Sequence, residues 1–525
     1  MRQLIDVSER EAQERGGAES VGTSSIQNKG EALSDLLTHP AAAEVVEHVL
    51  GEHYQLQISG CGFHKAGAKA LPLHTDSWWL PPPHRRDEPP TIKAGDVTRA
   101  LGYTPAWHPE GDYLTPSTRV GAIWMATAFT FENGAMQIVP GSHNSGRHPS
   151  KEEASRLPDN TSGRIPLCAP AGSVALYDGR LWHQKGANLG THDVDPITGS
   201  TDRMGIFVSY SAPFIRQQEN VTLTTSRELL RESSDEVREM LGLGSWQGLG
   251  RVGAEAPLLG TECGLGRMSG ASTSAPQPVA PPTPVEWAAG LPRPTKDAAA
   301  LRSDLELYGY CIVDSALGDA QRQALATRVA EQAAAEQSAG LSSGDDDVLT
   351  CLNKGDEFVE LLLHRDVNDA VRAVLGEEFQ LSEMRAAVGC GVASEVAPLT
   401  TQQWWAPPPI DRAVGVPARR PGSITRELAA ETGVEQQEFI VAALAAQVVF
   451  AVTDGTALRL APGSHLSGRH PNDAESESED ATTVSLPAGV AVVLDGRLWA
   501  APQPVRPAGG TPQEKSPDLA RTLGL

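Results

Sequence analysis

The alternation of apolar and polar residues predicts a chain built mostly of short β-strands. Residues 31–50 predict an opening helix, whereas RVGAIWMATAFTF at 119–131 alternates and is rich in β-branched and aromatic residues, as in a half-buried strand. Shorter apolar runs follow at 135–140, 172–178 and 202–212, separated by Gly, Asn and Pro. Repeated short strands with such punctuation favour an antiparallel barrel or jelly roll. The expected fold class is therefore mainly β with flanking helices (α+β).

The same motifs occur twice along the chain in the same order. The matching pairs are LLTHPAAAEVVEHVLGEHYQL (36–56) with LLLHRDVNDAVRAVLGEEFQL (361–381), PGSHNSGRHP (140–149) with PGSHLSGRHP (462–471), and YDGRLWH (177–183) with LDGRLWA (494–500). A fixed order, with an offset that drifts only between about 317 and 326 residues, predicts a duplicated domain. We therefore expect a first domain at 1–244, a linker rich in Pro, Ser and Ala at 245–300, and a second copy at 301–525.

Two segments of the second half give further local predictions. Residues 310–313 (YCIV), which have no counterpart in the first half, predict a short strand, and a helix is expected to begin near 318–319. The longest apolar run, 439–452, holds 14 residues. This is short of the roughly 20 residues that a membrane-spanning helix needs, so a buried strand or helix is expected there.

Composition narrows the possible partners. The 525 residues carry a net charge of −23, which argues against nucleic acid and against an anionic membrane surface. The six cysteines form no CxxC pair, so neither a disulfide framework nor a zinc ribbon is expected. The charged start of the chain lacks the apolar core of a secretory signal. These features predict a cytoplasmic protein.

The stretch PLHTDSWW holds a candidate metal site. In a strand, residues two apart point to the same face, so His74 and Asp76 can direct an imidazole and a carboxylate at one point. A second histidine would complete a face of two histidines and one carboxylate, which suits non-haem Fe(II) oxygen chemistry. His183, in DGRLWH after a predicted strand, is the best candidate. An H-x-D pair alone is weak evidence because short motifs match by chance.

The second half helps to decide which residues belong to this site. All three candidates are replaced there, by Thr400, Gln402 and Ala500, although the surrounding PGSH, WW and DGRLW motifs persist. Residues that bind the same metal ion are expected to be lost together when a copy of the domain loses the site. The second copy is therefore predicted to bind no iron and to be a pseudoenzyme domain that packs on the first. His143 and His148 persist in the second half, which favours turn and hydrogen-bonding roles for them.

Taken in order, the motifs resemble those of a known family. H-x-D, W-x-A followed by NG and VPGSH, DGRLWH, and an arginine that opens a strand are similar to the phytanoyl-CoA dioxygenase family of Fe(II)- and 2-oxoglutarate-dependent oxygenases. The resemblance implies a double-stranded β-helix (a cupin-like jelly roll) in each half of the chain. It maps the Fe(II) ligands onto His74, Asp76 and His183 and implies no catalytic residue beyond them.

The resemblance also implies a 2-oxoglutarate site. Arg203, which opens an apolar strand, would hold the distal carboxylate, because a guanidinium fork matches a carboxylate and stays charged when buried. Arg216 is a weaker candidate for this role. Trp124, whose counterpart in the second half is taken as Ala446, would line the cosubstrate pocket, and Thr75 would contact the cosubstrate. The alternatives are a surface position for Arg203 and core packing for Trp124.

Together these features predict an Fe(II)- and 2-oxoglutarate-dependent dioxygenase. With O2 it would hydroxylate a small organic substrate and decarboxylate 2-oxoglutarate to succinate. The insertion at 79–119, between Asp76 and the next predicted strand, departs from the family pattern and is expected to form a lid. Two alternatives stay open: a non-oxidative, metal-dependent cupin-like enzyme, and a non-catalytic binding or structural protein on the same fold.

Overall fold

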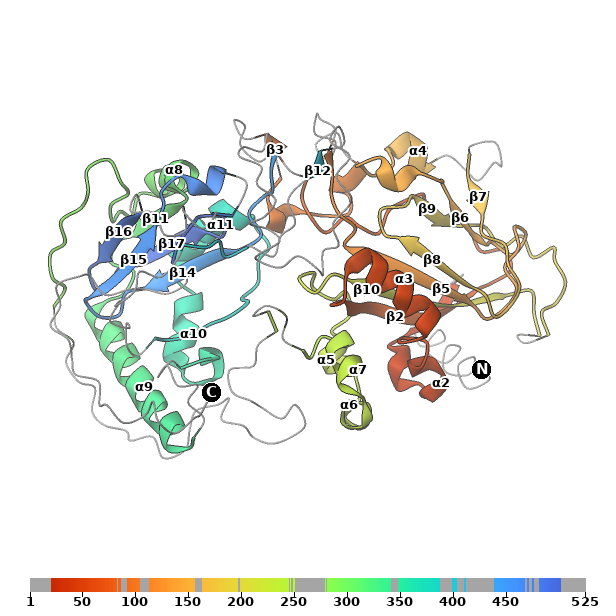
Figure 1. Cartoon of the computed structure of the whole chain (residues 1–525), viewed down its shortest axis with the longest axis horizontal. Helices are drawn as coiled ribbons and strands as arrows, with labels where there is room; N and C mark the ends of the chain where they lie inside the picture. Colours follow the sequence, from red (N-terminus) through yellow and green to blue (C-terminus); the bar gives the residue numbers. More distant parts are fainter. Residues whose placement is uncertain are drawn as a thin grey trace. The chain divides into compact units, whose positions relative to one another are not determined.

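Both halves of the chain consist of antiparallel sheets with helices beside them in the computed structural model (Figure 1). The structure describes residues 20–501, apart from 83, 86–91, 104–112, 156–162, 197–198, 245, 247–248, 251–278, 280, 341–347, 388–398, 404–409, 412–438, 468–469, 472–474 and 476–480. The described residues fall into two compact units. The first unit takes those from 20 to 250, with 410–411 and 439–442, and the second unit takes those from 279 to 403 and from 443 to 501.

A five-stranded antiparallel sheet is the frame of the first unit. Its strands are ordered β1 (Ser20–Ser24), β2 (Gln55–His64), β10 (Arg203–Ser211), β5 (Arg119–Met125) and β8 (Val174–Asp178). A smaller sheet is ordered β7 (Ile165–Pro166), β6 (Met136–Ile138) and β9 (His183–Lys185). Short ribbons join β3 (His84–Arg85) to β13 (Phe439–Ile440) and β4 (Tyr113–Leu114) to β12 (Ile410–Asp411). The strands predicted from the sequence are therefore present, although β5 ends at Met125.

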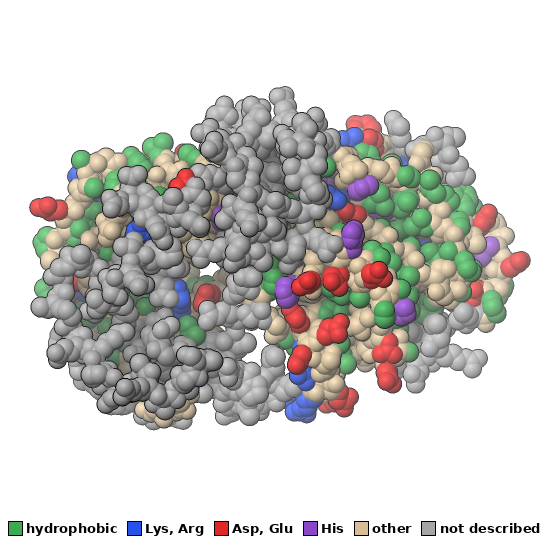
Figure 2. Space-filling view, in the orientation of Figure 1, with side chains coloured by type: hydrophobic (Ala, Val, Ile, Leu, Met, Phe, Trp, Pro, Cys, Tyr) green, Lys and Arg blue, Asp and Glu red, His purple; other side chains and the backbone are tan. Residues whose placement is uncertain are grey.

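The stretch predicted as one opening helix forms two. The first helix ends at Ser34, and residues 35–39 are not helical. Pro40 has no N–H with which to continue an earlier helix, but its fixed φ suits the first turn of a new one, so the second helix begins there. The helices of this unit are α2 (Glu31–Ser34), α3 (Pro40–Leu50), α4 (Lys151–Ser155), α5 (Val221–Thr224), α6 (Arg227–Glu232) and α7 (Asp235–Met240), with 3-10 turns η1 (Ile26–Asn28), η2 (Ala94–Asp96), η3 (Leu101–Tyr103) and η5 (Ser142–Asn144). Acidic side chains gather on the visible face of this unit (Figure 2), in keeping with the net charge of −23.

The two faces of β5 have different surroundings, and this decides where a site can lie. Val120 and Ala122 share a core cluster with Val46 of α3, so their face is covered by helix. Because side chains alternate along a strand, the residues between them point the other way. On that opposite face Met125 belongs to a separate apolar cluster with Phe129.

The second unit contains helices and two small antiparallel sheets. The sheets are β11 (Tyr310–Val313), β17 (Ala491–Asp495) and β14 (Ala446–Phe450) in that order, and β15 (Thr456–Leu460) with β16 (Thr482–Leu486). The helices are α8 (Ala298–Tyr308), α9 (Asp319–Ser338), α10 (Asp356–Leu362) and α11 (Arg365–Leu375), with 3-10 turns η6 (Cys351–Asn353) and η9 (Ser464–Leu466). The predictions of a strand at 310–313 and of a helix from 318–319 are confirmed. In the described ranges, no helix is long and apolar enough to cross a membrane.

Part of the expected linker packs within the second unit. The backbone N–H and the hydroxyl of Thr283 both donate to Oδ2 of Asp454, over 2.9 and 2.7 Å. Trp287 packs against the apolar core of this unit, and α8 begins at Ala298, before the boundary expected at 301. Residues 251–278 of the linker lie outside the described residues.

Candidate metal centre

The three predicted metal ligands lie together because two distant segments pair. His74 and His183 exchange two backbone hydrogen bonds, with N–H to carbonyl distances of 3.0 and 2.9 Å. Two residues on, the N–H of Asp76 donates to the carbonyl of Gly179 over 2.8 Å. The extended segment 74–76 is therefore held against the start of β9, and its alternation turns His74 and Asp76 to the same side.

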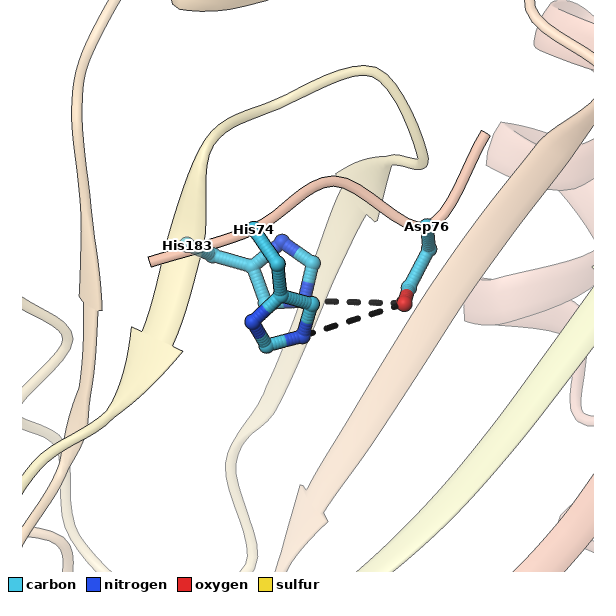
Figure 3. Close-up of side chains that lie close together, drawn as sticks. All are labelled: His74, Asp76 and His183. Atoms are coloured by element: carbon cyan, nitrogen blue, oxygen red, sulfur yellow. Dashed lines mark ion pairs between the residues drawn. The ribbon is translucent and has the colours of Figure 1, made fainter. Parts of the chain in front are cut away.

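The side chains of these residues converge on one point (Figure 3). Nε2 of His183 lies 3.5 Å from Oδ2 of Asp76, and Nε2 of His74 lies 3.9 Å from Oδ1. One ligand atom from each residue lies within 4.8 Å of the other two, so the group could hold a metal ion. The centroids of the two imidazole rings are 4.5 Å apart.

Backbone carbonyls fix which nitrogen of each imidazole is free. Nδ1 of His74 lies 2.8 Å from the carbonyl of Pro72, and Nδ1 of His183 lies 2.9 Å from the carbonyl of Leu181. A carbonyl only accepts, so both Nδ1 atoms carry the proton of the neutral ring and both Nε2 atoms keep a lone pair. Bonds of this kind orient histidines that bind metals. The Nε2 lone pairs are therefore available on the side where Asp76 lies.

The protonation states suit a divalent cation. Burial, together with the neighbouring His183, lowers the pKa of His74 to about 4, so its ring is neutral at pH 7. Burial alone would raise the pKa of Asp76, but the nearby positive charge of Arg119 outweighs it and holds that pKa below its ordinary range. Two imidazoles and one carboxylate are the ligand set of non-haem Fe(II) sites.

Three further residues approach the carboxylate of Asp76, and sequence reasoning missed all of them. The hydroxyl of Tyr177 donates to Oδ2 over 3.3 Å, and Nη2 of the buried Arg119 lies 3.7 Å from the same oxygen. Nη2 of Arg99, from the predicted lid insertion, lies 3.9 Å from Oδ1. The contrast between YDGRLWH and LDGRLWA carried a signal for Tyr177, since the tyrosine disappears together with the final histidine.

Arg203 is a buried cation at the start of β10. Only 8% of the residue is exposed, its Nη1 donates to the carbonyl of Gly134 over 2.7 Å, and its guanidinium carbon lies 4.3 Å from the ring centre of Phe129. Burial lowers the pKa of Arg203 to about 10. Its Nε has no hydrogen-bond partner, and no carboxylate among the described residues forms an ion pair with it. A surface position for this arginine is therefore ruled out.

Trp124 lies away from the metal ligands. It packs against the helix-covered core, and its ring centre lies 4.9 Å from that of His39, which precedes α3. Since Arg119 and Trp124 are five residues apart on one strand, they point to opposite faces of the sheet. Trp124 therefore packs in the core rather than beside Asp76. This is the core-packing role that the sequence analysis gave as the alternative to lining the cosubstrate pocket.

The strand register also corrects the assignment of the counterpart of Trp124. Val120 pairs with Asp178 in the first unit, and Ala446 pairs with the matching Asp495 in the second. Ala446 therefore corresponds to Val120. Counting four residues along the strand, Trp124 corresponds to Phe450.

Thr75 points away from its neighbours His74 and Asp76. Its Oγ1 lies 2.7 Å from Nδ1 of His148, which is buried, and both residues line a pocket on the other side of the strand from the metal ligands. His148 therefore has the hydrogen-bonding role expected of it. His143 lines the same pocket.

The fold and the site define a protein of antiparallel sheets that presents two histidines and one carboxylate to a metal ion. Residues 5–193 match the Phytanoyl-CoA dioxygenase (PhyH) family, so the chain contains a domain of this family. The match supports an oxygenase-type enzyme. It includes all three candidate ligands and ends before Arg203.

Several curated proteins are similar in sequence to parts of the chain. Dioxygenase af480 from Aspergillus fumigatus is 28% identical over 211 residues, which cover 40% of this chain and 54% of that protein. Uncharacterized protein Rv1501 from Mycobacterium tuberculosis is 26% identical over 123 residues, covering 23% and 40%. Dioxygenase aneA from Aspergillus aculeatus is 24% identical over 222 residues, covering 41% and 62%. The chain thus spans about half the length of the curated relatives it matches.

Solved structures give weaker matches. HygX from Streptomyces hygroscopicus, with nickel and 2-oxoglutarate bound, shares 16% identity with a TM-score of 0.29, over 42% of this chain and 80% of that chain. EctD from S. alaskensis, with bound Fe, shares 17% identity with a TM-score of 0.25, over 38% and 59%. At such TM-scores the likeness carries no weight of its own.

Proposed function

We propose that the first unit is an Fe(II)- and 2-oxoglutarate-dependent dioxygenase that hydroxylates a small organic substrate and decarboxylates 2-oxoglutarate to succinate. The observation that carries this proposal is the convergence of His74, Asp76 and His183, whose ligand atoms lie within 4.8 Å of one another with both Nε2 lone pairs free. Such a ligand set occupies one face of an octahedral ion and leaves the remaining positions for a cosubstrate and O2.

Arg203 supports the choice of 2-oxoglutarate as cosubstrate. A buried guanidinium without an anionic partner is unfavourable, and its open Nε provides a donor for an incoming carboxylate. A carboxylate can accept two parallel bonds from the guanidinium fork. The distal carboxylate of 2-oxoglutarate would supply the missing negative charge.

Two hydrogen bonds, one from the Arg203 side chain and one between backbone groups, connect Arg203 to the segment that carries a metal ligand. Arg203 donates to the carbonyl of Gly134, and the next residue, Ala135, accepts a hydrogen bond of 3.2 Å from the N–H of Gly186. Gly186 lies three residues after His183 and just beyond the end of β9. Arg203, in β10 of the five-stranded sheet, would thus be held against the turn beside the smaller sheet, whose strand β9 carries His183.

The roles of the chain's residues follow from these positions. Fe(II), when bound, would activate O2, which is the oxidant, and 2-oxoglutarate would supply two of the four electrons that reduce O2, with the substrate supplying the other two. His74 and His183 would donate their Nε2 lone pairs, Asp76 would supply the negative charge, and Arg203 would orient the cosubstrate. Arg99, which is about half exposed, would bring the insertion over the site as a lid that limits access of water.

The direct test is an anaerobic titration of the whole chain with Fe(II) and 2-oxoglutarate, in which the weak visible charge-transfer band is followed. His74→Ala should abolish the band. Thr400→Ala, at the matching position of the second unit, should leave it unchanged. If His74→Ala keeps the band, the assignment of the site is wrong.

Turnover separates this proposal from the two other functions. A dioxygenase forms succinate only when O2 is present. A non-oxidative cupin-like enzyme would bind metal but form no succinate in an O2-dependent manner. A non-catalytic protein would bind neither iron nor 2-oxoglutarate at useful affinity.

We also propose that 301–525 is a second copy of the double-stranded β-helix domain at 1–244, with its metal site erased. In support, Thr400 and Ala500 exchange backbone hydrogen bonds of 3.0 and 2.9 Å, as His74 and His183 do. The N–H of Gln402 likewise donates to the carbonyl of Gly496 over 2.8 Å.

Two side-chain contacts repeat as well. Thr401 Oγ1 lies 2.7 Å from His470 Nδ1, the same distance as between Thr75 and His148. The backbone N–H of Trp499 donates to the hydroxyl of Ser464, in the second PGSH motif, over 2.8 Å. The N–H of Trp182 donates to Ser142, in the first PGSH motif, over the same distance. On this proposal the chain binds one iron, and a stoichiometry of two would contradict it.

A further inference from the structure

Arg119 and Tyr177 hold the same oxygen of the proposed metal carboxylate from two different strands. Arg119 opens β5 and Tyr177 lies in β8, and both approach Oδ2 of Asp76, at 3.7 and 3.3 Å. A hydrogen bond from Tyr177 and the nearby charge of Arg119, both on one oxygen, restrict rotation of the carboxylate about its bond to Cβ. Its orientation toward a metal is then set before the metal arrives.

Both donors are themselves fixed in place. Nε of Arg119 donates to the hydroxyl of Ser209 over 2.6 Å, and the residue is only 7% exposed. The ring of Tyr177 lies over Gly121, where a Cβ atom would come within 2.3 Å of it, and its centre is 4.7 Å from that of His183. The absence of a side chain at Gly121 makes the room that this ring occupies.

The second unit lacks the arginine as well as the metal ligands. In the first unit the N–H of Gly179 donates to the carbonyl of Arg119 over 2.8 Å. In the second unit the N–H of Gly496 donates to the carbonyl of Ala445 over 2.9 Å. Ala445 therefore stands where Arg119 stands, and it provides no cation.

The tyrosine is missing from the second unit too. Tyr177 and Leu494 each come directly before the aspartate of the DGR motif. By contrast, the aspartate and arginine of that motif form the same 2.6 Å ion pair in both units. The residues that contact Asp76 have changed, whereas this ion pair beside them is retained. The sequence difference is an observation separate from the contact distances.

From these contacts and this joint loss, we propose that Arg119 and Tyr177 are positioning residues that orient and stabilise the metal-bound form of Asp76. The proposal rests on the metal site of the proposed function. Partners of this kind are worth about 10–100-fold in metal affinity. Arg119 offers no ligand atom, and the hydroxyl of Tyr177 donates to Asp76, so each acts through Asp76.

The test uses Co(II) as the probe, titrated into the whole chain, with affinity and the visible d–d spectrum as readouts. Tyr177→Phe should weaken Co(II) binding by about tenfold or more and change the spectrum. Tyr210→Phe is the matched control, because it also removes a buried tyrosine hydroxyl, one that donates to the carbonyl of Leu37 over 2.8 Å on the helix-covered side. It should leave both readouts unchanged.

A second pair of variants keeps the test independent of tyrosine packing. Arg119→Gln should weaken Co(II) binding, and Arg119→Lys, which keeps the charge, should recover part of the loss. If Tyr177→Phe and Arg119→Gln both bind Co(II) as the unchanged chain does, the positioning role is wrong. If His183→Ala does not weaken Co(II) binding, the proposed metal site itself fails.

Discussion

Replacing Arg203 by methionine should separate cosubstrate binding from stability. Most buried arginines form ion pairs, and breaking such a pair costs about 3–5 kcal/mol of folding free energy. Arg203 differs, because among the described residues its guanidinium has a backbone carbonyl as a partner but no carboxylate. Removing its charge should therefore do little harm to the ligand-free protein.

The structure sets the size of both effects. Burial lowers the pKa of Arg203 to about 10 from 12.5, and at about 1.4 kcal/mol per pKa unit the uncompensated charge costs about 3 kcal/mol. Arg203→Met removes this cost but leaves the carbonyl of Gly134 without its donor, which costs about 1–3 kcal/mol. The free energy of unfolding should therefore change by less than about 2 kcal/mol. Two charge-assisted hydrogen bonds to 2-oxoglutarate, at about 1.5–3 kcal/mol each, imply at least about 150-fold weaker binding.

Calorimetry with the redox-inert Ni(II) form would measure 2-oxoglutarate binding, and denaturant unfolding without ligand would measure stability. Arg216→Met is the control, because it removes an exposed arginine further along the chain. It should change neither quantity. The reasoning is refuted if Arg203→Met binds 2-oxoglutarate within threefold of the unchanged chain, or if it loses 3–5 kcal/mol of stability as a paired arginine would.

Two other predictions follow from close contacts and from burial. Gly121→Ala places a methyl group against the ring of Tyr177 and should weaken Co(II) binding. Gly60→Ala meets the ring of Phe207 at the same 2.3 Å and should lower stability without changing the affinity for Co(II). Equal Co(II) affinity in both variants would contradict this. Burial lowers the pKa of His64 to about 4 from 6.5, so the unfolded chain binds more protons between these values and the melting temperature should fall as the pH drops from 6.5 to 4. His64→Gln should flatten this fall, and an unchanged slope would show that His64 does not contribute.

Local rules predicted most strands, but they did not determine where the strands would end or how a helix would break. The alternation in 119–131 located β5, and the Gly-Asp pair near 318 located the start of α9. The apolar pattern of 31–50 predicts one helix, whereas the structure has α2 and, from Pro40 on, α3. Helix ends depend on such single residues, whose effect on backbone hydrogen bonding is larger than that of the apolar pattern.

By itself the sequence determined that His74 and Asp76 share one side of an extended segment, because strand alternation is local, and that His183 disappears together with them in the second half. Only the tertiary structure decided which residues surround this group. Arg119 and Tyr177 reach Asp76 from strands that lie 43 and 101 residues further along the chain, and Trp124 turns to the helix-covered face. Contacts of this kind depend on strand register and on which sheet face packs against a helix, and no short stretch of sequence contains either.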